Sequence, residues 1–506
     1  MTLAVVPDSL TTDGVSETFD SLDPATGDVV GTWPVHGPDE VGAAVQRARA
    51  ASQWWSGLDY AERARHLGAW KAVLARRVHE LADLMHRENG KPHADAVLEA
   101  ILAIDHIAWA AKNAKRVLGP RGVPSGLLGA NQAATLEYQP FGVIGVIGPW
   151  NYPVFTPMGS MAYALAAGNA VVFKPSEYTP GIGAWLVRAW EQAVPEQPAP
   201  VLQLVTGLGA TGAALCRAGV DKIAFTGSAA TGRKVMAACA ENLVPVLMEC
   251  GGKDALIVDD DANVKAAADA ALWGAMSNAG QTCTGVERVY ATEKVYDAFV
   301  AEITAAAKKV HAGSGADASY GPITMPGQLD IIDGHIKDAL ARGGRALVGG
   351  ASSVQAPYVA PTILVDVPED SAAVQAETFG PTITIKKVAD ADEAIALANA
   401  TSYGLAGTIF SGSKRRGMEL ARRLKGGMTS INAVIAFASI PALPFGGVGE
   451  SGFGRIHGDD GLREFTRPKA ITRQRFPMLV PLTSFRRPAK TTDVLAKVIG
   501  FLHGRG

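Results

Sequence analysis

The residue with the clearest chemical potential is Cys283, in the stretch Ser-Asn-Ala-Gly-Gln-Thr-Cys-Thr-Gly at residues 277–285. A helical-looking run precedes this stretch and a strand-like run follows it. A cysteine at such a junction can point into a cleft, and its short Gly and Thr neighbours let a substrate approach it. This pattern is compatible with a catalytic thiol. Most cysteines of intracellular chains are small core residues, so the local pattern leaves both interpretations open.

A second candidate is Glu249, at the end of the apolar run 244–248 and close to Gly251 and Gly252. A carboxyl held against apolar neighbours tends to have a raised pKa, which suits a general base that works near neutral pH. The two glycines leave room around it. The alternative is a carboxylate that caps a helix or joins two domains. Cys250, beside it, is expected to pack in the core.

Asn151 is the third candidate and lies in the segment Gly148–Pro153, after an apolar strand-like run. A side-chain amide inside so apolar a segment needs hydrogen-bond partners. As a neutral donor, it suits an oxyanion that develops during a reaction. The alternative is a turn asparagine that satisfies its own loop.

Lys174 and Glu177 stand where another buried strand ends. At the carboxyl edge of a sheet, a lysine can hold a ribose hydroxyl or a phosphate, and a glutamate can accept from both ribose hydroxyls. A carboxylate there would also repel a 2′-phosphate, which favours NAD over NADP. The alternative is a solvated ion pair at a strand end.

The segment Phe225–Thr231 turns from a strand into a helix and contains Gly227 and Ser228. Glycines at such a turn let backbone N–H groups approach a phosphate, and the positive end of the helix dipole favours the anion. A Gly-Ser turn is also an ordinary helix cap, so by itself this segment is weak evidence for a phosphate site.

These candidates sit at the ends of elements that alternate along the chain. After a helical region at about 41–117, strands are expected, with helices between them, at residues 143–147, 170–173, 201–205, 222–225 and 244–248. A second alternating series runs from Ala255 to about Ser430. Alternating strands and helices indicate parallel sheets covered on both faces. The predicted fold class is therefore α/β, with two doubly wound parallel-sheet domains and a small β arm.

Composition excludes several classes of protein. The chain has 506 residues, enough for two or three domains, and its formal net charge of −2 and lack of a basic run with aromatics give no sign of a nucleic-acid partner. Its four cysteines have no paired spacing, which argues against a disulfide framework or a zinc site and fits a cytoplasmic protein. Prolines interrupt the uncharged span Tyr138–Phe173, so no transmembrane segment is expected. The N-terminus carries Asp8, Asp13 and Glu17 and lacks a basic region followed by an apolar run, so no signal peptide is expected.

Taken together and in this order, the motifs resemble the pattern of the aldehyde dehydrogenase superfamily. The resemblance covers about residues 19–472 and rests on Pro149–Pro153, Lys174–Glu177, Phe225–Ser228, Met248–Lys253, Gly280–Cys283, Glu377–Pro381, Ile431–Asn432 and Pro444–Gly447. Eight ordered segments along nearly the whole chain make the resemblance specific.

The resemblance implies catalytic roles for three residues. Cys283 would be the nucleophile that forms a thiohemiacetal with an aldehyde and then a thioester. Asn151 and the backbone N–H of Cys283 would form the oxyanion hole. Glu249 would activate the water that hydrolyses the thioester to a carboxylic acid.

The resemblance also implies NAD as the cofactor, with NADP as the alternative, and no metal. The residues assigned to the cofactor are Trp150, Lys174, Glu177, Gly209, Phe225, Thr226, Gly227, Ser228, Glu377 and Phe379. Lys174 and Glu177 would hold the adenosine ribose, while Gly227 and Ser228 would lie beside the pyrophosphate. Glu377 would hold the nicotinamide ribose.

A domain plan follows from the same resemblance. It predicts an NAD-binding domain at 1–119 and 141–250, a catalytic domain at 251–450, an oligomerisation arm at 120–140 and 465–476, and a tail at 477–506. The arm would pair with a neighbouring subunit in a homodimer or homotetramer. An isolated strand near 134–138, expected from the residues alone, agrees with such an arm.

Four features of the chain qualify this resemblance and bear on packing, on the substrate and on partners. Gly159 stands where many members have a bulky aromatic residue, which predicts a roomier pocket, and Pro444–Gly458 resembles the class that acts on long-chain or aromatic aldehydes. Cys250 replaces a common leucine. The basic tail contains an amphipathic segment, Val494–Leu502, that could contact a membrane surface or dock on the protein, and docking is favoured.

Other members of the same superfamily are alternatives: one specific for semialdehydes, one that uses NADP, one that transfers the acyl group to coenzyme A, or a non-catalytic relative. Retention of Glu249 argues against the coenzyme A reaction. Retention of Cys283, Glu249 and Asn151 together argues against a non-catalytic role.

Overall fold

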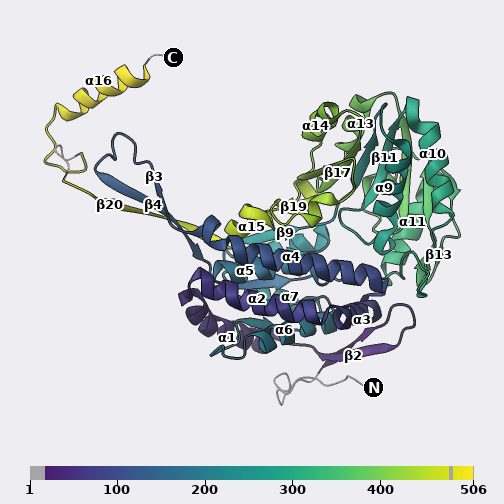
Figure 1. The fold of residues 1–506 in the computed structure, drawn as a ribbon, viewed down its shortest axis with the longest axis horizontal. Coiled ribbons are helices and arrows are strands. Elements are labelled where there is room, and N and C mark those ends of the chain that lie inside the picture. The colour runs from purple at the N-terminus through teal and green to yellow at the C-terminus, as the bar shows by residue number, and fades with distance from the viewer. Residues whose placement is uncertain (1–16, 478–481, 505–506) are drawn as a thin grey trace. The chain divides into compact units, whose positions relative to one another are not determined.

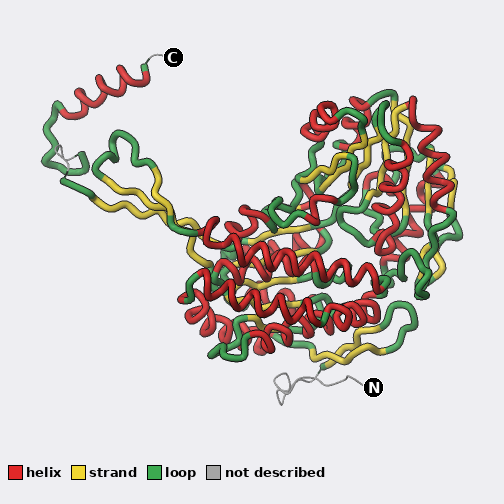
Figure 2. The backbone as a smooth tube through the Cα atoms, in the orientation of Figure 1, coloured by secondary structure: helices red, strands yellow, loops and turns green. Residues whose placement is uncertain are grey.

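The computed structural model describes residues 17–477 and 482–504. The chain divides into two compact units. The larger one, here called the body, runs up to Val117 and from Pro140 to Thr466, and the smaller one, the arm unit, contains Leu118–Gln139 and the residues from Arg467 onward. Figure 2 shows helices and strands throughout the body.

One half of the body is built on a six-stranded sheet in the order β19-β9-β8-β5-β6-β7. Its strands are β5 (Val143–Ile147), β6 (Ala170–Lys174), β7 (Leu202–Leu204), β8 (Lys222–Thr226), β9 (Val246–Glu249) and β19 (Gly452–Phe453). The strands β5 to β9 are parallel, and β19 joins β9 antiparallel. Their residues are almost all buried and apolar, as a sheet covered on both faces requires.

Helices cover both faces of this sheet (Figure 1). They are α1 (Pro38–Gly57), α2 (Tyr60–Arg76), α3 (Val78–Asn89), α4 (His93–Leu118), α5 (Phe155–Ala167), α6 (Pro180–Ala193), α7 (Gly209–Arg217), α8 (Ala229–Ala240) and α15 (Gly458–Glu464). The connections through α5 and α6 move the chain from β5 toward β7, and those through α7 and α8 return it on the other side of β5. Right-handed crossovers therefore place these two helix pairs on opposite faces, and the strand order reverses at β5.

The other half of the body has a seven-stranded sheet in the order β12-β15-β16-β11-β10-β17-β18. Its strands are β10 (Asp254–Val258), β11 (Val286–Thr292), β12 (Arg345–Val348), β15 (Thr362–Val365), β16 (Thr382–Val388), β17 (Ala406–Phe410) and β18 (Met428–Ile431). All pairings are parallel except that of the edge strand β12. Figure 1 shows this sheet beside the six-stranded one in the same body.

This second sheet is also covered on both faces. Its helices are α9 (Val264–Met276), α10 (Glu293–Ala307), α11 (Gln328–Ala341), α12 (Ala372–Gln375), α13 (Ala391–Ala398) and α14 (Lys414–Arg423). Alternate residues of β10 face different cores. Leu256 and Val258 pack with α9, α10 and α11, whereas Ala255 and Ile257 pack with α13 and α14.

The arm unit contains a three-stranded sheet in the order β20-β4-β3. Its strands are β3 (Arg121–Val123), β4 (Gln132–Pro140) and β20 (Thr466–Gln474), and it also contains the helix α16 (Thr491–His503). No residue of β3 or β4 is fully buried. Among the described residues, no helix combines the length and the apolar character that crossing a bilayer requires.

The predicted fold class is confirmed, because the body holds two largely parallel α/β sheets. The sequence did not predict the hairpin of β1 (Thr18–Leu22) and β2 (Val29–Pro34), or the short strands β13 (Val354–Gln355) and β14 (Tyr358–Val359). It also did not predict that the chain returns to the six-stranded sheet at β19, beyond the predicted end of the catalytic domain. Short antiparallel pairs carry too few residues to show a clear periodicity.

Candidate active site

The carboxyl ends of the parallel strands in the six-stranded sheet open onto one cavity of about 680 Å³. It lies at β5, where the strand order reverses, the place at which such sheets bind ligands. The predicted residues that line it are Trp150, Asn151, Lys174, Glu177, Gly209, Phe225, Thr226, Gly227, Ser228, Cys283, Glu377 and Phe379. The cavity therefore brings together every predicted site residue except Glu249.

Cys283 reaches this cavity from a loop with unusual backbone geometry. Asn278, Ala279 and Gly280 all have positive φ, at 51°, 58° and 71°, so three consecutive residues are left-handed. A Cβ added at Gly280 would lie 2.1 Å from the backbone of Gly380, so no other residue fits there without movement. The loop thus turns sharply between α9 and β11 and leaves Cys283 partly exposed.

Backbone from the link between the two sheets passes directly beside the thiol residue. A Cβ added at Gly252 would lie 2.4 Å from the carbonyl oxygen of Cys283, and one at Gly251 would lie 2.1 Å from Glu377 Oε2. The Gly252 N–H donates to Glu377 Oε1 at 2.9 Å. Because neither glycine has a side chain, the carboxyl of Glu377 can approach Cys283. From the sequence, the same two glycines were expected only to leave room around Glu249.

Burial raises the pKa of the Cys283 thiol far above its usual value, and the carboxyls of Glu377, Glu249 and Asp254 raise it further. The free thiol is therefore protonated near neutral pH. Burial also raises the pKa of Glu377 to about 8. The three carboxyls near this thiol therefore disfavour the thiolate in the free enzyme.

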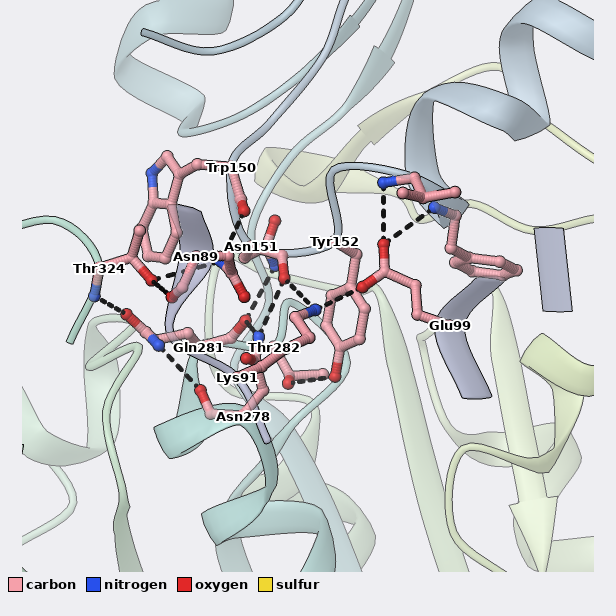
Figure 3. Close-up of polar contacts among 12 residues, drawn as sticks. Asn89, Lys91, Glu99, Trp150, Asn151, Tyr152, Asn278, Gln281, Thr282 and Thr324 are labelled. Atoms are coloured by element: carbon pink, nitrogen blue, oxygen red, sulfur yellow. Dashed lines mark hydrogen bonds and ion pairs between the residues drawn. The ribbon is translucent and has the colours of Figure 1, made fainter. Parts of the chain in front are cut away.

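The Asn151 side chain points toward the thiol loop. Its Nδ2 donates to the carbonyl of Gln281 at 2.9 Å, which anchors one of the two amide protons. The amide carries a second proton, which this contact does not use. Figure 3 shows Asn151 and Gln281 in contact, with Thr282 nearby.

Glu249 ends β9 but does not line the cavity. Its side chain is 3% exposed, and a Cβ added at Gly446 would lie 2.6 Å from its Oε1, an oxygen without a hydrogen-bond partner among the described residues. Burial raises its pKa well above the usual value, while Arg455 opposes this rise. In this conformation the carboxyl is therefore a buried acid turned toward Gly446.

The other end of the cavity suits a dinucleotide. Lys174 is almost fully buried and donates to the carbonyl of Pro175 at 3.1 Å, and burial lowers the pKa of its ammonium. Glu177 lies beside it in the cavity lining. Ser228 caps α8 by accepting from the Thr231 N–H at 3.3 Å, so the positive end of this helix faces the cavity. These residues fit the ribose and the phosphates of NAD or NADP.

Two aromatic rings line the cavity near Glu377. Trp150 and Phe379 meet edge to face, with ring centroids 5.5 Å apart. Phe379 has a positive φ of 52°, and its segment is fixed by Glu287, which accepts from the N–H groups of Thr378 and Phe379. Glu287 is itself paired with the buried Lys253. This pair was not singled out from the sequence.

Sequence reasoning also missed several residues that line the cavity. They are Tyr178, Cys216, Lys234, Met325, Gln328 and Ile331. Most of them lie on helices or loops without a motif of their own, so only the fold brings them to the site. Cys250, which was expected to pack in the core, is indeed mostly buried but also borders the cavity.

The expectation of a roomier pocket at Gly159 needs correction. A Cβ added at Gly159 would lie 2.5 Å from His457 Nε2, so the imidazole ring fills the space that the glycine leaves. His457 is 1% exposed, and neither of its ring nitrogens has a hydrogen-bond partner among the described residues. Burial lowers its pKa well below the usual value, so the ring is neutral.

Comparison with known proteins decides the family. A model of the "Aldehyde dehydrogenase family" matches residues 11–471. The chain belongs to the aldehyde dehydrogenase family. It is 36% identical over 464 residues to a 4,4'-diapolycopene aldehyde oxidase from a Methylomonas species, covering 91% of this chain and 87% of the relative. It is 35% identical over 462 residues to a glutarate-semialdehyde dehydrogenase from Pseudomonas putida, covering 90% and 94%.

The crystal structure of an NADP-dependent enzyme from Escherichia coli superposes with a TM-score of 0.86 at 34% identity, covering 90% of this chain and 95% of that one. This aldehyde dehydrogenase is therefore an enzyme that oxidises aldehydes to carboxylic acids with NAD or NADP. The predicted family, fold class and reaction class are confirmed.

The charges around Cys283 predict how fast its thiol reacts in the free enzyme. Glu377→Gln removes a carboxylate that disfavours the thiolate, so the pKa of Cys283 should fall and alkylation by iodoacetamide should speed up several-fold. Because the pKa of Glu377 is about 8, the difference should grow as the pH rises above that value. The measurement is the alkylation rate as a function of pH.

Two controls accompany this experiment. Cys283→Ser reports the background reaction of the three other thiols, and Glu419→Gln removes an exposed carboxylate on α14, away from the cavity. Identical pH profiles for Glu377→Gln and the unaltered enzyme would contradict the electrostatic account.

Proposed function

We propose that Cys283, Asn151 and Glu249 carry out aldehyde oxidation in this enzyme. The observation that supports this most is the single cavity in which Cys283 and the Asn151 amide lie with the residues assigned to the cofactor. The Cys283 thiol gives its proton to water, and its sulfur then attacks the aldehyde carbon. The carbonyl oxygen becomes an oxyanion that accepts from Asn151 Nδ2 and the Cys283 backbone N–H. A bound nicotinamide supplies the acceptor for the hydride that leaves this carbon.

The second half of the proposed reaction belongs to Glu249. The acyl group remains on Cys283 as a thioester, and a water molecule attacks it to release the acid. Glu249 takes the proton from this water after its side chain turns from Gly446 toward the cavity. Its raised pKa suits a base that must accept a proton near neutral pH.

We propose NAD rather than NADP as the preferred cofactor. Glu177 lines the cavity beside Lys174, where its carboxylate accepts from the ribose hydroxyls and repels a 2′-phosphate. The NADP-dependent structural relative leaves the use of NADP as the second candidate.

The aldehyde itself belongs to one of two classes. The segment Pro444–Gly458 supports a long-chain or aromatic aldehyde, and one relative acts on 4,4'-diapolycopene aldehyde. The second candidate is a semialdehyde, as for the glutarate-semialdehyde dehydrogenase. A panel of aliphatic, aromatic and semialdehyde substrates with both cofactors discriminates these classes.

The division into an NAD-binding domain, a catalytic domain and an oligomerisation arm stays a proposal. It is supported by the two sheets of the body and by the separate arm unit. The outer strands β3 and β20 each leave one edge without a strand partner in their sheet, which suits pairing with a second copy in a homodimer or homotetramer. The free thiols of all four cysteines support a cytoplasmic location.

We propose that the helix α16 docks on a protein surface. Val494, Val498 and Leu502 recur along one apolar side, and all three are exposed. A helix that lies in a membrane surface is usually rich in Lys and Arg on its polar side, whereas α16 carries Lys497 and Asp493. This charge pattern favours docking on the protein body over contact with a lipid surface.

Substitution of the proposed nucleophile and base should separate the two half-reactions. Cys283→Ala should abolish NADH formation from any aldehyde. Glu249→Gln should keep a burst of one NADH per site and slow the steady rate by about 10²-fold or more, because thioester hydrolysis loses its base. Rapid-mixing absorbance of NADH measures both phases. An unchanged steady rate, or a variant without a burst, contradicts the role of Glu249.

The cofactor preference should depend on Glu177. Glu177→Gln should shift the ratio of kcat/KM values toward NADP by about tenfold, which corresponds to about 1.4 kcal/mol. Glu191→Gln, an exposed glutamate outside the cavity, is the matched control and should leave the ratio unchanged. A shift of equal size in both variants would overturn the assignment.

Removal of the tail tests the docking of α16. A chain that ends at Phe476 should lose thermal stability or oligomeric mass relative to the full chain, as measured by scanning calorimetry and sedimentation. Neither form should float with vesicles of anionic lipid. Flotation of the full chain alone would show that α16 contacts a membrane surface instead.

A further inference from the structure

A buried ion pair outside the cavity, Lys91 with Glu99, lies close to the active-site loops. Lys91 follows α3, Glu99 lies in the first turns of α4, and both side chains are only 1% exposed. Removing two charges from water is unfavourable unless their attraction and further hydrogen bonds offset it. Neither residue lines the cofactor cavity. Lys91 and Glu99 each contact the segment that carries Asn151.

Lys91 holds the segment that carries the oxyanion donor. Its Nζ donates to Glu99 Oε2 and, at 2.9 Å, to the carbonyl oxygen of Asn151. The ammonium also lies 4.3 Å from the centroid of the Tyr152 ring, a cation–π contact. One cation therefore fixes the main chain of Asn151 and the side chain of the next residue.

Glu99 holds the other end of the same segment. Its Oε1 accepts from the N–H groups of Val154 at 2.8 Å and Phe155 at 3.0 Å. These groups belong to the start of α5, where backbone donors lack partners within the helix. The ion pair thus holds residues 151–155 at both ends. Lys91 binds the carbonyl of Asn151, and Glu99 binds the N–H groups at the start of α5.

The segment held in this way contacts the thiol loop at three points, which Figure 3 shows together. Asn151 Nδ2 donates to the Gln281 carbonyl at 2.9 Å, and Asn278 Nδ2 donates to the Asn151 carbonyl at 3.0 Å. The Tyr152 hydroxyl and Thr282 Oγ1 are 3.0 Å apart. The carbonyl oxygen that Lys91 binds therefore also binds the loop of Cys283.

We infer that Lys91 and Glu99 are positioning residues that fix the Asn151 amide relative to the Cys283 sulfur; this rests on the proposed role of Asn151 as the oxyanion donor. Stabilisation of an oxyanion depends on donors that are in place before charge develops. A misplacement of about 1 Å costs about 10²-fold in rate. The ion pair supplies this placement from outside the cavity, without touching cofactor or substrate.

Lys91→Met is the first test. It should lower the rate of the NADH burst by about 10²-fold, because the burst reports the step in which the oxyanion forms. The dissociation constant of NADH should stay within about twofold, since Lys91 does not line the cavity. Lys91→Arg keeps a cation at this position and should recover part of the rate. A burst rate equal to that of the unaltered enzyme would overturn the inference.

A double substitution separates positioning from stability. Lys91→Met leaves the buried Glu99 carboxylate without its cation, so its melting temperature should fall. Lys91→Met/Glu99→Gln removes both charges and keeps an acceptor for the start of α5, so the melting temperature should recover. If the pair positions Asn151, the burst stays slow in the double variant. Recovery of rate and stability together would show a purely structural role and refute the inference.

The coupling to Asn151 provides the decisive comparison. If Lys91 acts through Asn151, adding Lys91→Met to Asn151→Ala should slow the burst no further than Asn151→Ala alone. Multiplicative effects would contradict the inference while leaving Asn151 as the donor. An unchanged burst rate in Asn151→Ala would instead remove the proposed function of Asn151, and with it this role of Lys91.

The matched control is Glu88→Gln compared with Glu99→Gln. Glu88 is also a fully buried carboxyl that accepts from the start of a helix, the N–H groups of Gly181 and Ile182 in α6. Both substitutions keep the acceptor, but only Glu99→Gln removes the charge that partners Lys91. The burst should slow in Glu99→Gln alone; equal slowing in both variants would overturn the inference.

Discussion

The arrangement of the active site depends on the close approach of two backbone segments. The chain passes from the six-stranded sheet to the seven-stranded sheet through Gly251 and Gly252, and Gly252 lies against the carbonyl of Cys283. No room for a Cβ exists at either glycine, since the carbonyl of Cys283 and the carboxyl of Glu377 take the space. Cys283, the carboxyl of Glu377 and the link between the sheets are thereby fixed relative to one another.

Around this contact, polar groups from distant parts of the sequence support the loops that carry chemistry. Lys91 with Glu99 holds the segment of Asn151, and Lys253 with Glu287 holds the segment after Glu377. Each pair combines a buried cation and a carboxylate that also accepts backbone N–H groups. A buried pair of this kind specifies one loop conformation because any other conformation leaves a charge without partners.

The sequence predicted much of the site because most of the candidate residues lie at the ends of strands that the sequence pattern also predicts. Lys174, Gly227 and Asn151 follow strands whose patterns are clear, so the rule for parallel sheets places them at one edge. The orientation of Glu249 could not be predicted, because it depends on Gly446 and Arg455, which lie about 200 residues later in the chain. The ion pair Lys91–Glu99 was also missed, since a lysine and a glutamate eight residues apart carry no local signal of burial.

The His457 ring occupies the space beside Gly159, and this limits which residues can replace either one during evolution. The imidazole occupies the volume that a side chain at 159 would need, and Phe155, Tyr163 and Phe445 surround the ring. A larger residue at 159 is compatible with the fold only when residue 457 becomes smaller or rotates away. The two positions are therefore expected to mutate as a coupled pair. A larger residue at 159 alone destabilises the fold, and a smaller residue at 457 restores its stability. The order of the two substitutions therefore limits the evolutionary paths open to the chain.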